Sequence, residues 1–426
     1  MRKCQLEIMR LASLCTALIV LTGCSRAPEP ADVTMRVENG VTIVENPGLD
    51  IADSLAWSID TTDVVRIGVV DGPDEYMFSR LIAALFLPGD EILIADGTAH
   101  ELRIFDARGQ FVRKTGRRGR GPGEFTYLSN VLHYFGDSIL VIDREGGRAN
   151  VLDPNLVYVR QFRPTLRDSS ADSPGSSGSL AGFFDDGRAF FRDYLNVCRG
   201  IDPFREGFCV DSLAFFAADQ NGATRARFGH FVYDRYERYR VGPGHFTGWR
   251  EPHPQPIWAI QGDRFYYGDA MRFEILVFKN DGSLERRIRV GQTAPRFEKN
   301  VVWPKQDPPP NASPDIKRGT EVATNAQATA ALPDTFPSFS DLLVDDVGNI
   351  WVREYLPPSL LPDLKPRWFV FDPEGRLRWS IRSPAGMVRT FRTFSQMGPQ
   401  ITNDQILAPA RDSDGVKSVV VYQLRK

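Results

Sequence analysis

A unit of apolar strands and glycine-containing turns recurs six times along the 426-residue chain, and this repeat constrains the fold more than any other feature. In each copy a first strand leads to a turn of glycine, aspartate or asparagine, and a second strand follows. A third strand then ends at an aromatic or aliphatic residue, and the six residues at this position are Phe105, Leu152, Phe216, Phe278, Phe371 and Tyr422. Five copies continue into a hairpin turn such as Asp372-Pro373-Glu374-Gly375, where glycine or asparagine supplies a positive φ.

The spacing of the copies predicts the architecture. When residues 1–63 and a long insertion at 292–340 are set aside, each copy has about 52 residues, close to the roughly 40–50 residues of a four-stranded propeller blade. The strands are short and rich in β-branched and aromatic residues, with little helical periodicity. We therefore expect an all-β fold over residues 64–426: a six-bladed β-propeller of four-stranded antiparallel blades.

The sixth copy ends at Lys426, directly after its third strand. A blade without its outer strand would expose an unpaired edge, which proteins avoid. Val64–Val70 has the length and composition to supply that strand, so we expect the ring to be closed by an N-terminal strand. Gly40–Glu45 is a second candidate, and the pattern does not separate the two.

Residues 101–125, ELRIFDARGQFVRKTGRRGRGPGEF, carry a family resemblance. This stretch resembles the NHL-type repeat, whose blades end in "vFd..G" and cross over through "G..G.GpGeF". The whole of residues 64–426 is similar to bacterial six-bladed propeller lipoproteins related to that repeat, although the third copy is interrupted and the segment before the fifth departs from the pattern. The resemblance implies a fold and an exported location, and it implies no reaction.

The N-terminus is typical of an export signal. A basic start is followed by an apolar run of eleven residues, Leu11–Leu21, too short for the roughly 20 residues that span a bilayer. Residues 1–23 are therefore predicted to be a signal peptide, with Met1 and Met9 both open as the start. Leu21-Thr22-Gly23-Cys24 resembles the bacterial lipobox, so Cys24 is the predicted lipidation site; the alternative is an ordinary secretory signal with a chance cysteine.

Lipidation of Cys24 would tether the chain to a membrane. Acyl chains on one cysteine provide two or more hydrophobic anchors, which give stable attachment. Residues 24–63 would form the tether and lead-in strands. By resemblance to lipoprotein sorting, Ser25 after the cysteine favours the outer membrane, facing the periplasm or the cell exterior.

Two cysteines remain in the body of the chain, Cys198 and Cys209. An even pair in an oxidising compartment predicts a disulfide bond, and two buried free thiols are the alternative. The ten residues between them contain turn formers, while Arg188–Val197 and Val210–Phe216 resemble strands. We expect a hairpin elongated beyond its blade, which the disulfide would stabilise by on the order of 3 kcal/mol.

Composition and motifs exclude several function classes. The formal net charge is −2, and because residues 1–23 carry three basic residues and one acidic residue, the remainder carries −4. This charge and the export signal disfavour a nucleic-acid partner. The sequence has no HExxH, CxxC, GxxxxGK or GxSxG motif, and its five histidines are scattered. No cofactor and no metal site are predicted, with a divalent cation left as an open alternative.

Two sets of polar residues are candidate ligand contacts. Arg117, Arg118 and Arg120 lie in a glycine-rich segment with five positive charges in the eight residues 113–120. They could contact an anion or polysaccharide, or be solvated in a linker between blades. A strand follows the segment, whereas a phosphate-binding loop requires a helix.

Acidic residues end the second strand of four copies: Asp96, Asp143, Asp193 and Asp269. They could ring the mouth of the central channel and bind a divalent cation, as in lactonase-type propellers. Because the position recurs in most copies, the sequence favours the alternative that each carboxylate closes its own turn.

The aromatic and basic segments Phe228–Arg240 and Pro252–Trp258 are typical of recognition surfaces and also of packing between blades. Within the insertion, Ile316–Ala331 is predicted to form a helix, in a flap on one face. The absence of an asymmetric catalytic set favours a non-enzymatic module that binds a protein, peptide or glycan. A metal-dependent hydrolase or lyase at the channel mouth is the alternative.

Overall fold

The fold is taken from a computed structural model of the chain. The residues that it describes are 32–49, 57–164, 178–195, 207–241, 244–249, 256–291, 307–329, 335–356, 365–384, 387, 398–412 and 414–426. Among them, no helix is long and apolar enough to cross a membrane.

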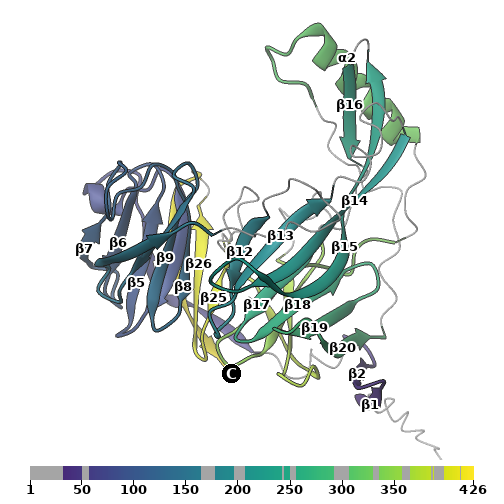
Figure 1. The fold of residues 1–426 in the computed structure, drawn as a ribbon, viewed down its shortest axis with the longest axis horizontal. Helices are drawn as coiled ribbons and strands as arrows, with labels where there is room; N and C mark the ends of the chain where they lie inside the picture. The colour runs from purple at the N-terminus through teal and green to yellow at the C-terminus, as the bar shows by residue number, and fades with distance from the viewer. Residues whose placement is uncertain are drawn as a thin grey trace, which may run out of the picture. The chain divides into compact units, whose positions relative to one another are not determined.

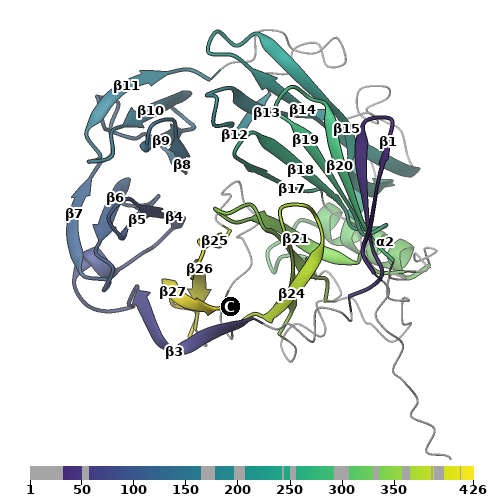
Figure 2. The ribbon, with the colours of Figure 1, turned by 90° about the horizontal axis from the view of Figure 1, so that it is seen from below.

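The described strands form six sheets around a ring, which Figure 2 shows. Blade one contains β4 (Leu81–Leu87), β5 (Glu91–Asp96), β6 (Glu101–Phe105) and β7 (Phe111–Thr115). Blade two contains β8 (Leu128–Tyr134), β9 (Ser138–Asp143), β10 (Arg148–Leu152) and β11 (Tyr158–Phe162). Blade three contains β12 (Ser179–Phe183), β13 (Ala189–Leu195), β14 (Gly207–Ala218), β15 (Thr224–Val241) and β16 (Gly244–Trp249).

The other three blades follow the same order from the inside of the ring outward. Blade four contains β17 (Ile257–Gln261), β18 (Arg264–Asp269), β19 (Glu274–Lys279) and β20 (Leu284–Val290). Blade five contains β21 (Phe339–Val344), β22 (Ile350–Glu354), β23 (Arg367–Phe371) and β24 (Leu377–Arg382). Blade six contains β25 (Gln400–Ile401), β26 (Gln405–Arg411), β27 (Lys417–Arg425) and β3 (Ser58–Ile67).

The core lies between neighbouring blades. All six residues that end the third strands are buried, which is why the repeat keeps an apolar residue there. Between blades one and two, for example, side chains of both sheets pack in one cluster that includes Leu93, Ile104, Phe125, Val141 and Leu152. Antiparallel pairing within the blades and burial between them confirm the predicted six-bladed propeller.

An N-terminal strand closes the ring, as predicted, and the structure identifies which one. Strand β3 pairs antiparallel with β27, with Val65 opposite Val421 and Ile67 opposite Val419. The segment Gly40–Glu45 has a different role. It contributes to β2 (Val41–Asn46), which pairs with β1 (Thr34–Glu38) and runs parallel to β20, so that blade four has six strands.

A buried asparagine fixes this N-terminal hairpin between blades four and five. The Asn46 amide nitrogen donates hydrogen bonds to the carbonyl oxygens of Gly375 and Arg289, at 3.0 and 3.2 Å. Its amide oxygen accepts the backbone N–H of Leu377 at 2.7 Å. Because the side chain is buried and its polar groups are satisfied, the hairpin is an integral part of the rim.

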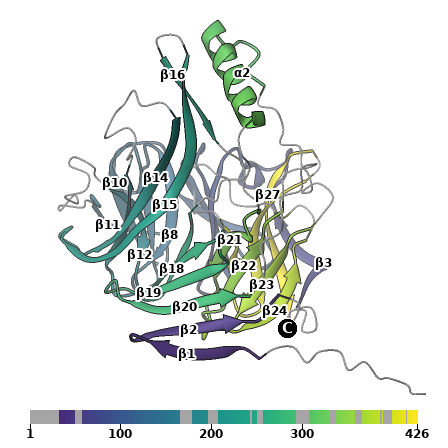
Figure 3. The ribbon, with the colours of Figure 1, turned by 90° about the vertical axis from the view of Figure 1, so that its right-hand side faces the viewer.

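An arm extends from blade three, as Figures 1 and 3 show. Strand β15 has 18 residues, and beyond the blade it pairs with β16. Helix α2 (Pro314–Thr329), from the insertion, contacts both strands. The predicted helix over 316–331 is thus confirmed, two residues nearer the N-terminus at each end. The elongated hairpin was expected between Arg188–Val197 and Val210–Phe216, whereas the extra length is seen in the β14–β15 pair; residues 196–206 lie outside the described part.

Candidate binding site

The carboxylates that end the second strands close turns of their own blades. Asp96 accepts backbone N–H groups from Ser79, Thr98 and Ala99, at 3.2, 2.8 and 3.2 Å. Asp269 accepts the N–H of Met271 at 3.0 Å and lies 3.8 Å from the Arg272 guanidinium. These bonds favour the interpretation that each carboxylate is structural.

Asp143 is the most heavily hydrogen-bonded of these carboxylates. It accepts the N–H groups of Thr126, Tyr127 and Gly146 at 2.9, 2.8 and 3.2 Å, and the Arg148 Nε–H at 3.1 Å. Burial opposes its ionisation, but the hydrogen bonds outweigh burial and hold the pKa of Asp143 below its usual value. Asp193 is also buried, and the described residues contain no group of three His, Cys, Asp or Glu side chains arranged to hold a metal ion.

The glycine-rich segment between blades one and two neutralises part of its own charge. Arg117 donates to the Glu124 carboxylate at 2.8 Å (Nε to Oε1), and the Gly121 N–H donates to its Oε2 at 2.8 Å. The Gly121 bond and then the Arg117 bond lower the pKa of Glu124. A Cβ at Gly119 would lie 2.1 Å from the Glu124 carboxylate, so a larger residue there would displace this carboxylate from its present position. The Glu124 carboxylate therefore occupies the Arg117 side chain and the Gly121 N–H, which an external anion would otherwise contact.

The other two predicted arginines of this segment keep their side chains available. Arg118 and Arg120 are exposed. Their backbones are used, because Arg118 forms a bridge with Phe125 and the Arg120 carbonyl accepts a hydrogen bond from Arg148. Within the described part of the chain, neither guanidinium has a hydrogen bond or ion pair. The structure thus separates Arg117 from the two neighbours with which it was predicted.

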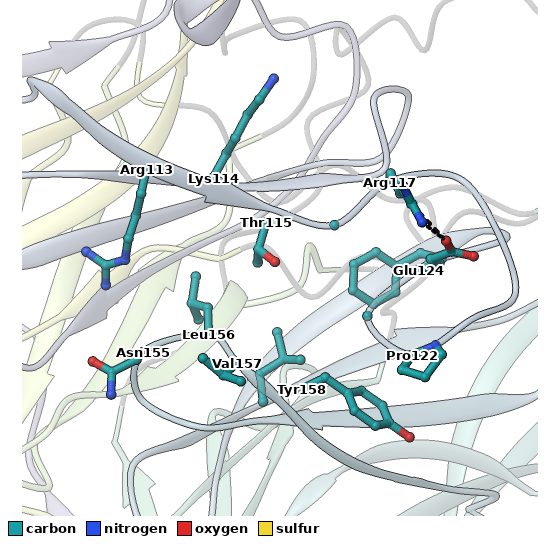
Figure 4. A pocket seen from close by; sticks show the side chains of 14 residues that line it. Arg113, Lys114, Thr115, Arg117, Pro122, Glu124, Asn155, Leu156, Val157 and Tyr158 are labelled. Carbon is teal, nitrogen blue, oxygen red and sulfur yellow. Dashed lines mark hydrogen bonds and ion pairs between the residues drawn. The ribbon is translucent and has the colours of Figure 1, made fainter.

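A pocket of about 510 Å³ lies beside this segment (Figure 4). One wall comes from the end of β7 and the crossover, and the other from the turn between β10 and β11. Figure 4 shows Arg113 and Thr115 on the side of the strand that faces the turn, and Lys114 on the opposite side. The lining residues are Arg113, Lys114, Thr115, Gly116, Arg117, Pro122, Gly123, Glu124, Phe125, Leu152, Asn155, Leu156, Val157 and Tyr158.

Leu156 explains why the turn beside the pocket differs from its counterparts. Its φ is 63°, a conformation that L side chains rarely adopt, and its N–H donates to the Asp153 carbonyl at 2.8 Å. The same hydrogen bond in blades one, three, four and five is made by glycines with positive φ, namely Gly109, Gly222, Gly282 and Gly375. A buried leucine therefore replaces the glycine of the repeat in blade two alone among these five turns.

The glycines at this position allow close contact with the preceding blade. A Cβ on Gly109 would lie 2.8 Å from Val65 Cγ1 in β3, and a Cβ on Gly375 would lie 2.6 Å from Ile288 Cγ1 in β20. In blade two, the turn and β7 of the preceding blade instead form the two walls of the pocket. The pocket therefore lies where the repeat departs from its own pattern.

Sequence reasoning had named Arg117 at this site but missed the wall that faces it, Asn155–Tyr158. A signal was present in the sequence. Three of the four glycine-containing turns begin with aspartate and end with glycine, whereas the matching turn of blade two is Asp153-Pro154-Asn155-Leu156.

The cysteine predictions fall mainly outside the described residues. Cys24 and Cys198 both lie outside the described residues. Cys209 is buried in β14 and is disulfide-bonded. Leu195 in β13 pairs with Ser212 in β14. The Cys198–Cys209 pairing stays a prediction, because Cys198 lies outside the described residues.

The aromatic segment Phe228–Arg240 lies in β15 and serves mainly packing where its side chains are described. Phe228 and Phe231 pack in one cluster with Phe265 of blade four. Trp258, at the end of the second aromatic segment, packs against Phe190 and Phe215. Residues 252–255 of that segment lie outside the described part.

Comparison with known proteins agrees with the topology. Residues 71–150 match a family model described as a 6-bladed beta-propeller. No curated protein matches the chain. A putative exported protein from Bacteroides fragilis is 13% identical in sequence, with a TM-score of 0.46, over 90% of this chain and 100% of that one.

Two further solved structures are similar at comparable coverage. A member of the duf4221 family from Bacteroides vulgatus is 9% identical, with a TM-score of 0.48, over 87% of this chain and 98% of that one. A catalytically inactive virginiamycin B lyase from Staphylococcus aureus, solved with quinupristin, is 8% identical, with a TM-score of 0.35, over 91% and 98%. The strand order and the matched family model together identify the chain as a six-bladed β-propeller.

Proposed function

We propose that the protein is a lipid-anchored extracytoplasmic binding module whose ligand site is the pocket between blades one and two. The observation that carries this proposal is Leu156, a buried leucine with positive φ at a position where four other blades have glycine. A left-handed conformation costs a non-glycine residue about 1–2 kcal/mol. Strain of this kind persists at functional sites, where the surrounding structure holds it in place.

The composition of the pocket supports the same proposal. Binding sites for small ligands and side chains are concave, about 300–1,000 Å³ in volume, and mostly apolar with a few polar groups. Val157 supplies exposed apolar surface, and the core residues Phe125, Leu152 and Leu156 lie directly beneath the pocket. The side-chain polar groups of Thr115 and Asn155 have no hydrogen bond to any described residue, so both are available to a ligand.

Anchoring through Cys24 would hold this module at a membrane. Cys24 precedes Thr34, the first residue of β1, by ten positions, and ten residues span at most about 35 Å. Replacing Cys24 by Ser should release the protein into the soluble extracytoplasmic fraction. A variant that stays as membrane-bound as the wild type would contradict lipidation at this residue.

A pair of exposed valines offers a matched test of the pocket. Val157 lines the pocket and Val159 does not, and their exposed fractions are similar, 60% and 56%. Each is replaced by Cys in the full chain carrying Cys24→Ser and is labelled with an environment-sensitive fluorophore. Peptide and oligosaccharide libraries are then titrated in parallel.

The proposal predicts that at least one ligand class changes the emission of the label at position 157 and leaves the label at position 159 unchanged. No response to any class, or equal responses at both positions, would contradict a ligand site in this pocket. Metal analysis of the same protein tests the hydrolase or lyase alternative, because a stoichiometric and chelator-resistant divalent ion would contradict a pure binding module.

A further inference from the structure

We infer that the ligand of the pocket between blades one and two is an acidic peptide segment with one large apolar side chain. This inference rests on the proposed binding function and assigns a chemical class to its ligand. It is carried by the charges around the pocket, by the apolar wall, and by the uncommitted polar groups of the lining.

The cations of residues 113–120 are only partly neutralised. Arg113 makes two hydrogen bonds to the Glu91 carboxylate, at 2.6 and 2.8 Å, and Lys114 bonds to Glu101 at 2.9 Å. Arg117 is paired to Glu124, and Glu101 is shared between Lys114 and Arg103.

Arg118 and Arg120 remain as exposed positive charges on the loop whose residues Arg117 and Pro122 line the pocket; the two arginines lie beside the lining and are not part of it. The chain as a whole carries a formal charge of −2, so this positive surface is local. Opposite charge on a partner would steer it to this loop and raise its association rate.

The apolar wall defines the second requirement of the ligand. Val157, which is 60% exposed, provides the accessible part of this wall, and Leu152 and Leu156 are already buried beneath it in the core between the two blades. A leucine- or phenylalanine-sized side chain packed on this wall gives the ligand an anchor that charge alone does not provide. A peptide can place an apolar anchor and flanking carboxylates at the required spacing.

The polar groups of the lining match a peptide backbone. Asn155 offers both a donor and an acceptor, and Tyr158 and Thr115 offer hydroxyl groups without hydrogen bonds to described residues. A neutral glycan could use these groups but would leave the two free arginines without a counter-charge. The charges therefore favour the peptide over the glycan.

The test selects ligands from a displayed library of random 12-residue peptides, with the full chain carrying Cys24→Ser as the target. The selected peptides are then measured against an Arg118→Ala/Arg120→Ala variant. The control variant is Arg108→Ala/Arg163→Ala, which removes two exposed arginines that lie outside the crossover loop of residues 116–125. Oligosaccharides are titrated against the label at position 157 in the same series.

We expect the enriched peptides to combine net negative charge with one large apolar residue. Because an exposed charge pair contributes up to about 1 kcal/mol, the Arg118→Ala/Arg120→Ala variant should bind them about tenfold more weakly. The control variant should bind as the wild type does, and binding should weaken as salt rises.

Enrichment of neutral or basic peptides, no enrichment, or equal losses in both double variants would overturn the inference. The proposed binding function would survive that result if a neutral oligosaccharide still changed the emission of the label at position 157. If no ligand of any class changed it, both proposals would fail.

Discussion

Replacing Leu156 by glycine should cost less stability than replacing it by alanine, which reverses the order expected in a strand. Both changes delete the buried side chain, and a large-to-small change at a buried leucine costs about 2–5 kcal/mol. Alanine keeps the unfavourable positive φ of this position, whereas glycine removes strain of about 1–2 kcal/mol. Glycine also makes the unfolded chain more flexible, which costs about 0.5–1 kcal/mol.

The difference between the two effects is roughly 0–1.5 kcal/mol, with a central value of about 0.8 kcal/mol in favour of Leu156→Gly over Leu156→Ala. Leu152 supplies the matched control. It belongs to the same buried cluster and is in strand β10 with ordinary negative φ. There the alanine variant should be the more stable of the two, by roughly 0.5–1 kcal/mol.

Urea-induced unfolding of the four variants, followed by tryptophan fluorescence, measures both differences. The seven tryptophans of the chain provide the signal. If the free energy of unfolding falls with urea concentration at the same slope in all four variants, differences between their midpoints report differences in stability. If alanine were as stable as glycine at position 156, or the two positions showed the same order, Leu156 would not be strained and the central structural argument would fail.

Three further predictions address the core, the carboxylates and the ring. Asn150 is fully buried, and neither polar atom of its side chain has a hydrogen-bond partner among the described residues. Asn150→Leu should therefore raise the free energy of unfolding, measured by urea titration, by about 1 kcal/mol. A lower free energy of unfolding in the variant would contradict this. Because hydrogen bonds lower the pKa of Asp143, its ionised form stabilises the fold above the ordinary aspartate pKa, and this contribution is lost as the pH falls through the lowered pKa of the folded state. The stability gap between wild type and Asp143→Asn should therefore narrow as the pH falls from about 4 toward 2, and a constant gap would refute this assignment. A chain that begins at residue 75 loses β3, so its melting temperature should fall or it should aggregate through the open edge of β27. A chain that begins at residue 57 loses only β1 and β2 and should remain monodisperse. Equal melting temperatures and equal aggregation of the two chains would show that β3 does not close the ring.

The repeat predicted the strands well because burial between blades imposes the same apolar positions on every copy. Phe105 and Phe371 end equivalent strands, and both are fully buried. The closing strand was harder to identify, since Val64–Val70 and Gly40–Glu45 are equally rich in β-branched residues. Their roles differ because β3 pairs with β27 whereas β2 pairs with β20, and the sequence pattern does not show which strands become neighbours.

The candidate site was predicted only in part, for a physical reason. The cations of residues 113–120 are conspicuous in the sequence, but whether Arg113 and Lys114 are paired depends on Glu91 and Glu101, which are distant in sequence and adjacent in space. Leu156 resembles any core leucine in the sequence. Its significance depends on backbone conformation, which becomes visible when its turn is compared with those that contain Gly109 and Gly375.

The extra length of the arm lies in the β14–β15 pair, which sequence reasoning did not single out. Strands β14 and β15 stay paired from Ala218 opposite Thr224 to Gly207 opposite Arg238, and the register shifts at three places. Such shifts break the two-residue alternation on which strand prediction depends. The polar and aromatic stretch of β15 therefore did not stand out as one continuous strand.

Amide hydrogen exchange of the full chain, with and without a peptide selected as described above, tests the central claim most directly. A ligand bound between blades one and two should slow exchange in residues 113–125 and 152–158, which form the two walls of the pocket. Exchange elsewhere in the ring should be unchanged. Protection at the inner strands β4, β8 and β25 without protection of the two walls would place the ligand in the central channel and contradict the account.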